Sequence, residues 1–539
     1  MIIPNLPPIP RMPRFVTAAL LLVALLGGCW VLFEWWNRHQ TPPSQPRPVP
    51  DGDQEVAWFH TPTAYEAWDH FVRALKRIER NRTIPHFFVD DTHAFPHRTT
   101  AIPEVIIGRS DRMGRLHIRW YKVTDVVPQS RWVELLLRRS PAPLAIIAGW
   151  SSDRAAELAE ALRDAPQADK PALLLTAATA EQVATDAAMT GPAGPPLVSL
   201  YDRTFRFCFS NRQMAEALSD FLLSENSLRP HAGAEPWLLS TTTAWCNPWA
   251  ALATLLCPEI PAFAIDWQDD PYSLDLSLHL RRELTRRCPT LPGGPRLIVI
   301  RSQIPFSTGS VHQPNAAELD AIHHLLQHLP PAPRRTVLLL PTVTVPARRV
   351  LQALVQEESE VGQRLVAITG DGISVNTLFR DRDVAWPIRS MPIPLVLFAH
   401  ADPFAWDEAQ ERDRLTNGYA LPAPLPGQVC STTEEVEHLR RLMEVLVTAA
   451  YTTEPPVLIS KAEQLCQALR GLQPPFFDSA GNRRGGSGEH IVVLRPQPSG
   501  VEDPRCEALL EVYTRQAGAG GWFCLHRRLL YQFYHDRTP

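Results

Sequence analysis

Short apolar runs alternate with amphipathic stretches along most of this chain. Residues 144–148 (LAIIA) and 172–175 (ALLL) are continuous apolar runs, and residues 153–163 between them repeat their apolar positions at helical spacing. Strands that are buried on both faces of a parallel sheet read as such runs, and the helices that cover them read as amphipathic. The pattern therefore predicts an α/β fold.

The same alternation continues through the first 400 residues. Strands are expected over residues 116–123, 144–148, 172–175, 205–209, 237–239, 297–300, 336–340, 365–368 and 394–398. Helices are expected over residues 62–78, 130–139, 153–163, 213–223, 274–284, 316–328 and 347–355.

These units form two series, one on each side of residue 230, and each series is long enough for a sheet of its own. A chain of 539 residues is also too long for one compact core. We therefore expect two doubly wound parallel-sheet lobes behind an N-terminal anchor. The expected division is 1–38 anchor or signal segment, 39–55 Pro-rich linker, 56–230 first lobe (returning at about 425–470), 231–424 second lobe (returning at about 471–500) and 501–539 C-terminal extension.

The N-terminus has the features of a membrane anchor. Residues 15–33 carry no charged side chain, which is nearly the length of about 20 residues that spans a bilayer core. Arg11 and Arg14 precede this run and favour a cytoplasmic N-terminus. Two alternatives stay open: an uncleaved transmembrane helix, or a signal that is cleaved, including a lipoprotein signal in which Cys29 is lipidated. In each case the bulk of the chain is expected to be extracytoplasmic, either periplasmic or at the cell surface.

Composition removes several other classes of function. The net charge is −4 at pH 7, which gives no basic surface for nucleic acid. Besides Cys29 the chain has eight cysteines, an even number that permits disulfides without fixing their pairing. His324 and His328 stand one helical turn apart, but no third ligand accompanies them, so an exposed helix face is expected rather than a metal site. We expect no metal and no cofactor.

Several segments resemble, in order, the branched-chain amino-acid (leucine-binding) type of ABC-transporter substrate-binding protein. The segments are residues 144–162 (LAIIAGWSSDRAAELAEAL), 172–183 (ALLLTAATAEQV), 205–222 (FRFCFSNRQMAEALSDFL), 267–280 (WQDDPYSLDLSLHL) and 476–494 (FFDSAGNRRGGSGEHIVVL). The resemblance implies a type I periplasmic-binding fold whose chain crosses the hinge between the lobes more than once. Residues 432–469 would then return to the first lobe, and residues 476–484 would cross back.

The sequence departs from the family's pattern in two places. The usual opening strand with its Gly-containing loop is not found before residue 116, although residues 87–91 (FFVDD) serve in part. Residues 285–425 also run longer than the pattern. These departures bear on the identity of the ligand more than on the fold.

Candidate binding residues lie where predicted strands end. Ser151 and Ser152 come between a strand and a helix, where hydroxyl and backbone N–H groups hold a carboxylate, or where serine simply caps the helix. The resemblance implies that the Ala177 carbonyl and the Thr179 hydroxyl contact an α-amino group, with helix capping as the alternative. From the second lobe, Asp269, Asp270 and Tyr272 would face the ligand or form an ordinary helix start. The expected ligand-binding residues are Ser151, Ser152, Ala177, Thr179, Asp270 and Tyr272.

The resemblance implies a ligand-binding receptor: the solute-binding component of an ABC-type importer for amino acids or similar small polar solutes. Its partners would be the ligand, an ABC permease and the membrane, with no nucleic acid. The alternatives are a membrane-anchored sensor or scaffold with the same fold but no transport, and a membrane-anchored hydrolase. No GxSxG, HExxH or Walker-type sequence is present, so no enzyme activity is expected.

Overall fold

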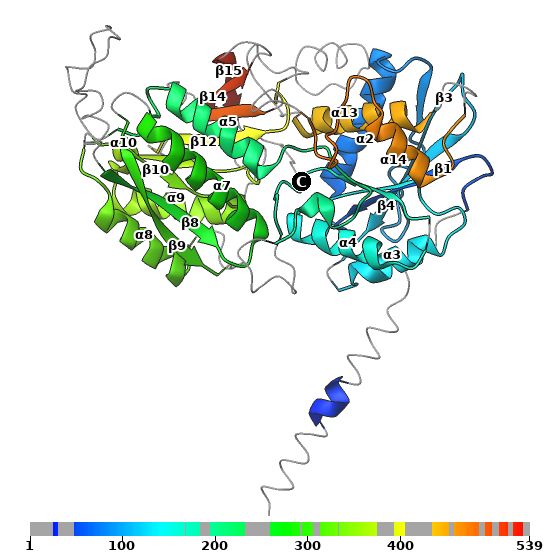
Figure 1. Ribbon diagram of the computed structural model, residues 1–539, viewed down its shortest axis with the longest axis horizontal. Coiled ribbons are helices and arrows are strands. Elements are labelled where there is room, and N and C mark those ends of the chain that lie inside the picture. Colours follow the sequence, from blue (N-terminus) through cyan, green and yellow to red (C-terminus); the bar gives the residue numbers. More distant parts are fainter. Residues whose placement is uncertain are drawn as a thin grey trace, which may run out of the picture.

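The chain forms two α/β lobes that lie side by side (Figure 1). In this computed structural model the described residues are 25–30, 48–124, 126–167, 169–183, 194–231, 259–290, 294–305, 313–332, 334–374, 393–404, 434–451, 457–484, 491–498, 506–515 and 521–531. Each lobe is built on one sheet with helices on its faces, so the predicted α/β class with two lobes is confirmed.

The first lobe is built on a seven-stranded sheet of order β2-β3-β4-β1-β5-β6-β7. Strand β1 lies at its centre and pairs in parallel with both β4 and β5. The edge formed by β2 and β3 is antiparallel. The strands are β1 (Gln54–His60), β2 (Phe87–Asp90), β3 (Glu104–Arg109), β4 (Arg115–Lys122), β5 (Ala145–Ala148), β6 (Ala172–Leu175) and β7 (Thr204–Arg206).

Helices from distant parts of the chain cover this first sheet. On one face α2 (Tyr65–Asn81) packs against α13 (Glu434–Ala450), with α14 (Ala462–Arg470) beside them, and their apolar side chains share one core with the sheet. On the other face lie α3 (Gln129–Leu137), α4 (Ser152–Asp164) and the 3₁₀ turn η2 (Leu197–Ser199). The first lobe is therefore completed by residues that lie more than 200 positions further along the chain.

The second lobe is built on an eight-stranded sheet of order β15-β14-β13-β12-β11-β10-β8-β9. Strands β8 to β12 are parallel, whereas β13, β14 and β15 add an antiparallel edge. The strands are β8 (Glu259–Trp267), β9 (Arg296–Ile304), β10 (Thr336–Leu339), β11 (Leu365–Ile368), β12 (Leu395–Ala399), β13 (Val492–Gln497), β14 (Cys506–Arg515) and β15 (Trp522–Tyr531).

Two pairs of helices cover the second sheet. On one face α5 (Asn211–Ser224) packs against α7 (Pro271–Arg287), which continues into the 3₁₀ turn η4 (Cys288–Thr290). On the other face lie α8 (Ala316–His328) and α9 (Thr344–Glu357), followed by the short α10 (Val361–Arg364). Buried leucines on both pairs complete the core on either side of the sheet.

Each lobe is assembled from separated segments. In the described residues the chain passes from the first lobe to the second after β7, returns between β12 and α13, and passes back between α14 and β13. The sequence-based division places residues 56–230 in the first lobe, whereas α5 packs on α7 in the second. The other domain bounds stay predictions.

Several expectations about the sheets need correction. The sheets are mixed rather than wholly parallel, because hairpins add antiparallel strands at one edge of each. The missing opening strand is β1, whose polar Gln54 and Glu55 follow a Pro-rich stretch and hide its apolar pattern. The strand expected over residues 205–209 covers only β7, and the C-terminal extension contains β14 and β15. The strand expected over residues 237–239 lies outside the described residues.

Most of the expected membrane anchor also lies outside the described residues. Only residues 25–30 of that segment are described, as a short exposed helical stretch that includes the candidate lipidation residue Cys29. Among the described residues no helix is long and apolar enough to cross a bilayer. The anchor is therefore not supported by the structure and stays a prediction.

Candidate functional site

Carboxyl ends of strands from both lobes meet side chains of α13 between the lobes. His60 ends β1 and Thr176 follows β6 in the first lobe, while Asp371 and His400 follow β11 and β12 in the second. The rings of His400 and of His438 on α13 lie 4.7 Å apart and so join the two lobes. We call the following residues the interlobe cluster: His60, Thr176, Asp371, His400, Glu434, Glu435 and His438.

The start of α13 supplies three of the six titratable groups in this cluster, Glu434, Glu435 and His438. His438 donates a hydrogen bond from Nε2 to the Thr176 carbonyl at 2.9 Å, which fixes the helix to the end of β6. Glu435 accepts a hydrogen bond at 2.6 Å from Nδ1 of His70, a residue of α2. Helix α13 therefore holds its acidic N-terminal turn over the strand ends of the first lobe.

The second lobe places an imidazole and a carboxylate opposite this turn. The His400 ring stacks on Phe209 at 4.1 Å, and its Nε2 donates to Asp371 at 3.1 Å. The Tyr272 hydroxyl accepts a hydrogen bond from the Gly372 backbone N–H at 3.1 Å. A Cβ atom at Gly370 would come within 1.9 Å of that hydroxyl, so glycine is required for Tyr272 to lie against the turn.

Solvent reaches the space between the lobes. The Glu435 side chain is 46% exposed, although it lies close enough to interact electrostatically with His60 and with His400 of the opposite lobe. Residues at the strand ends and helix starts of both lobes are half-buried. From the two lobes these half-buried residues are His60, Trp150, Ser151, Thr176, Asp270, Tyr272, Asp371 and His400.

Burial moves the pKa values of several groups in the cluster away from their usual range. It lowers the pKa of His60 to about 4 and that of His438 well below its usual value, so both rings are neutral at pH 7. It raises the pKa of Glu434 to about 8, with a contribution from neighbouring Glu435, so Glu434 is largely protonated. Burial acts in the same direction on Glu435, but the hydrogen bond from His70 and the electrostatic interactions with the neighbouring histidines together outweigh it and lower the pKa of Glu435.

Several polar atoms of the cluster lack a hydrogen-bond partner among the described residues. These atoms are Oε2 of Glu434, Oδ1 of Asp371 and Nδ1 of His400. Buried polar atoms are rarely left unpaired in folded proteins, so such groups point to a bound solute or to ordered water. The described residues contain no group of three or more His, Cys, Asp or Glu side chains that would hold a metal ion.

The residues predicted from the first lobe lie at the expected strand ends but differ in exposure. Ser151 is half-buried and precedes α4 without forming a side-chain cap, and Ala177 is exposed. Ser152 is only 3% exposed, and its hydroxyl accepts a hydrogen bond from the Ala180 N–H at 3.2 Å. Thr179 is fully buried, and its hydroxyl has no partner among the described residues. Contact of these four residues with a ligand stays a prediction.

The residues predicted from the second lobe lie at the start of α7. Asp270 caps that helix by accepting a hydrogen bond from the Tyr272 N–H at 3.0 Å. Burial, helped by the charge of Asp153 in the first lobe, raises the pKa of Asp270 to about 6. Asp269 is exposed at the preceding turn. Capping, the alternative reading from the sequence, therefore applies to Asp270, and its contact with a ligand stays a prediction.

Sequence reasoning missed a carboxylate that joins the lobes. Asp275 of α7 is 5% exposed and accepts hydrogen bonds from the backbone N–H groups of Glu181 at 2.8 Å and Gln182 at 3.3 Å, both in the first lobe. The Asn211 side chain donates to the same carboxylate at 2.9 Å. The sequence also gave no sign that Glu434, Glu435 and His438 meet His400, since consecutive acidic residues before an apolar run are typical of any helix start.

The chain has a type I periplasmic-binding-like fold. Its two α/β lobes are each assembled from separated segments, and polar groups lie between the lobes at strand ends. No protein-family model and no curated protein matches this chain. Solved structures similar to it include an ABC transporter substrate-binding protein from Desulfitobacterium hafniense (15% identity, 85% of this chain and 99% of that one, TM-score 0.45).

Two further similar structures bind small solutes. One is a leucine-binding protein from Thermotoga maritima (12% identity, 88% of this chain and 98% of that one, TM-score 0.44). The other is a solute-binding protein of an ABC transporter from Rhodopseudomonas palustris in complex with p-hydroxybenzoic acid (11% identity, 88% and 97%, TM-score 0.46). These likenesses are weak, and the fold class stands on the topology of the chain itself.

Proposed function

We propose that this chain is an extracytoplasmic solute-binding receptor that delivers a small polar solute to an ABC-type importer. The observation that carries the proposal is the interlobe cluster, in which both lobes contribute buried polar atoms without a partner among the described residues, close to the partly exposed Glu435 carboxylate. In open α/β sheets ligands bind beyond the carboxyl ends of the strands, and the cluster has this position. Closing two lobes on a solute is a common way to bind it.

The charges of the cluster favour a ligand with an ammonium group. Glu435 is ionised and solvent-accessible, and its neighbours His60 and Glu434 are neutral at pH 7. The N-terminus of α4, which Ser151 does not cap, offers backbone N–H groups to a carboxylate. An amino acid or a similar zwitterion matches both features, in agreement with the predicted contacts at Ser151, Ala177 and Tyr272.

The proposed location is outside the cytoplasm, with the N-terminal segment as the tether. The Pro-rich linker over residues 39–55 separates the apolar segment from most of the first lobe, although the structure assigns its last two residues to β1. A Pro-rich chain is extended and semi-rigid, so it would hold the lobes away from the bilayer surface.

The test is a thermal-shift screen of the full-length chain in detergent against amino acids, small amides, sugars and hydroxybenzoates. A solute that binds the folded state raises the apparent melting temperature, and calorimetry then gives its Kd. Because Glu435 is expected to pair with the ammonium group, Glu435→Gln should weaken binding about tenfold, the loss of one charge-assisted hydrogen bond.

The matched control is Glu444→Gln, which changes a carboxylate on the same helix that pairs with Arg440. It should leave Kd unchanged. If no solute shifts the melting temperature, or if the two variants weaken binding equally, the importer proposal fails.

A second candidate is a sensor or scaffold that keeps this fold without transport. The observation in its favour is Asp275, which joins the lobes through hydrogen bonds to Glu181 and Gln182. A receptor that delivers solute must reopen, and an internal tether opposes reopening. Solute binding without transport by an adjacent permease would favour this second candidate.

A further inference from the structure

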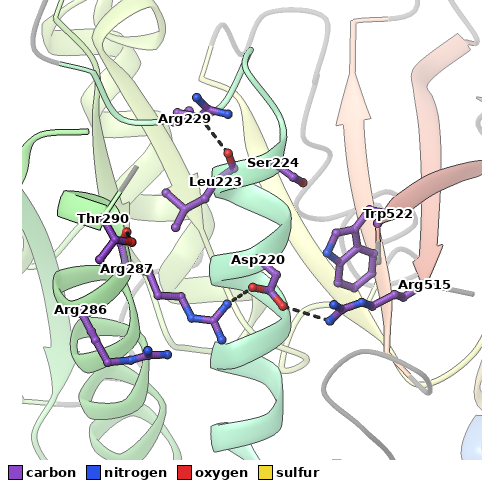
Figure 2. A pocket seen from close by; sticks show the side chains of 10 residues that line it. Asp220, Leu223, Ser224, Arg229, Arg286, Arg287, Thr290, Arg515 and Trp522 are labelled. Atoms are coloured by element: carbon purple, nitrogen blue, oxygen red, sulfur yellow. Dashed lines mark hydrogen bonds and ion pairs between the residues drawn. The ribbon is translucent and has the colours of Figure 1, made fainter. Parts of the chain in front are cut away.

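A hollow lies on the second lobe, away from the interlobe cluster. Its volume is about 630 Å³, and it lies between the carboxyl ends of α5 and α7 and the hairpin of β14 and β15 (Figure 2). Tyr272 stands at the opposite end of α7 from Arg287, a distance of about 22 Å along the helix. We call this hollow the arginine pocket, for its lining residues Arg229, Arg286, Arg287 and Arg515.

Positive charge exceeds negative charge in the arginine pocket. Asp220 pairs with Arg287 and with Arg515, the latter at 3.0 Å, and Figure 2 shows the two guanidinium groups approaching it from opposite sides. Glu283 accepts from Arg286 at 2.6 Å and from Arg287 at 2.8 Å. Among the described residues four guanidinium groups thus share two carboxylates, which leaves a net charge of about +2. Glu216 also acts on Arg286, but it pairs with Arg212.

Arg229 is the guanidinium group that no carboxylate balances among the described residues. Its Nε donates at 2.8 Å to the Leu223 carbonyl, a neutral acceptor at the end of α5. Arginines near helix carboxyl ends stabilise those ends, and this accounts for part of the cluster. It does not account for the excess charge, since like charges that converge on one hollow repel each other unless an anion lies between them.

Trp522 adds an aromatic wall to the pocket. Its ring packs edge-on against Phe221 at 5.6 Å, which fixes it on the hairpin side of the pocket. Its indole Nε1 is buried and has no acceptor among the described residues. An aromatic ring beside unbalanced guanidinium groups favours a ligand that is both flat and negatively charged.

We propose that the arginine pocket binds a small aromatic dianion, such as a phosphate monoester or a dicarboxylate. The two negative charges match the excess of positive charge, and the flat part of the ligand packs on Trp522. The volume lies within the range of about 300–1,000 Å³ that small-molecule sites occupy. The proposal is independent of the solute bound between the lobes.

The experiment titrates the full-length chain in detergent with phenyl phosphate and with benzene-1,2-dicarboxylate, followed by calorimetry. Phenol and inorganic phosphate are the comparison probes, because each carries only one of the two expected features. We expect both aromatic dianions to bind at least tenfold more tightly than either comparison probe. We also expect binding to weaken as salt is raised, since the interaction is electrostatic.

Two variants separate this pocket from the rest of the surface. Arg229→Gln and Arg286→Gln should each weaken phenyl phosphate about tenfold, and neither residue holds Asp220 in place. The matched control is Arg296→Gln, an exposed arginine of the same lobe that pairs with Glu259, and it should have no effect.

Three results would overturn the proposal: aromatic dianions that bind no better than inorganic phosphate, binding that survives in the Arg229→Gln, Arg286→Gln double variant, or equal loss in the Arg296→Gln control. Thermal unfolding of each variant identifies a loss that is due to misfolding. In that case Trp522→Leu, which removes the aromatic wall and keeps the four arginines, provides the deciding comparison.

Discussion

Strand β1 has a polar cluster at each of its two ends, and the two clusters differ in how fully their groups are paired. At its amino end Glu55 is 1% exposed. The Glu55 carboxylate accepts hydrogen bonds from Tyr121 at 2.6 Å, from Arg119 at 2.7 Å and from both terminal nitrogens of Arg139. At its carboxyl end His60 belongs to the interlobe cluster, where Glu434, Asp371 and His400 each retain an unpaired atom.

Burial and charge alone therefore do not distinguish a polar cluster that stabilises the fold from one that could bind a ligand. Both clusters contain buried carboxylates and basic groups, but the Glu55 carboxylate has all its partners within one lobe. The interlobe cluster draws its members from both lobes and leaves three buried polar atoms without a partner among the described residues. The contrast suggests that the amino end of the sheet holds the first lobe together, while the carboxyl end is available to a solute.

The largest loss of stability is expected from a substitution in the fully paired cluster around Glu55, at the amino end of β1. Glu55→Gln leaves the guanidinium group of Arg119, which is buried in the sheet, without part of its compensation. The free energy of unfolding should fall by about 3–5 kcal/mol in chemical denaturation. Glu157→Gln, an exposed carboxylate on α4, should change it by less than about 0.5 kcal/mol. A small loss at Glu55 would remove the distinction drawn between the two ends of β1.

The next effect concerns pH at the unpaired end. The pKa of Glu434 is about 8 in the folded chain against 4.5 for an ordinary glutamate side chain, so its contribution to stability is complete below pH 4.5 and is lost as pH rises through 8. Glu434→Gln does not ionise and lacks this loss. The stability of the variant relative to the native chain should therefore rise by about 2–4 kcal/mol between pH 4.5 and pH 8. Parallel denaturation curves across this range would contradict the assignment.

A smaller effect is expected at the contact that joins the lobes. Asp275→Asn weakens the hydrogen bonds to Glu181 and Gln182, at a cost of about 1–3 kcal/mol to the joined state. The lobes should separate, which small-angle scattering would detect as a larger radius of gyration. Asp320→Asn, on the exposed face of α8, should leave the radius unchanged. An unchanged radius in both variants would mean that other contacts hold the lobes together.

The smallest effect is expected at Thr179. Its hydroxyl is fully buried without a partner among the described residues, so Thr179→Val should raise the free energy of unfolding by about 1 kcal/mol. The predicted ligand contact is tested in the same variant. Binding that weakens about tenfold would support the contact. Unchanged affinity would mean that Thr179 only stabilises the first lobe.

The sequence was sufficient for those elements whose pattern is local. The apolar runs of β5, β6 and β11 and the helical spacing of α8 mark their own positions, and the structure has them within one residue of expectation. Strand β1 was not predicted from the sequence, because a glutamate such as Glu55 is typical of exposed positions. The partners that make its burial tolerable, Arg119 and Arg139, lie 64 and 84 positions away.

The interlobe cluster was hidden for a similar reason. The sequence places candidate residues at strand ends within one lobe, because strand ends follow from local pattern. His400 and His438 meet only because the chain returns to the first lobe before α13. Arg515 and Arg229 likewise line the same pocket only because the C-terminal hairpin joins the second sheet. No spacing along a single sequence reports such contacts.

The separated segments of each lobe also constrain how the protein is made. Helix α2 buries its apolar face against α13, and roughly 350 residues must be synthesised between them. At about 5–20 residues per second, synthesis of these residues takes on the order of 20–70 s, and the first lobe cannot complete its core before α13 and α14 have left the ribosome. Neither half has a completed core until nearly the whole polypeptide exists. A nascent chain in this state stays open for a long interval, which suits passage through a secretion channel that accepts only unfolded protein.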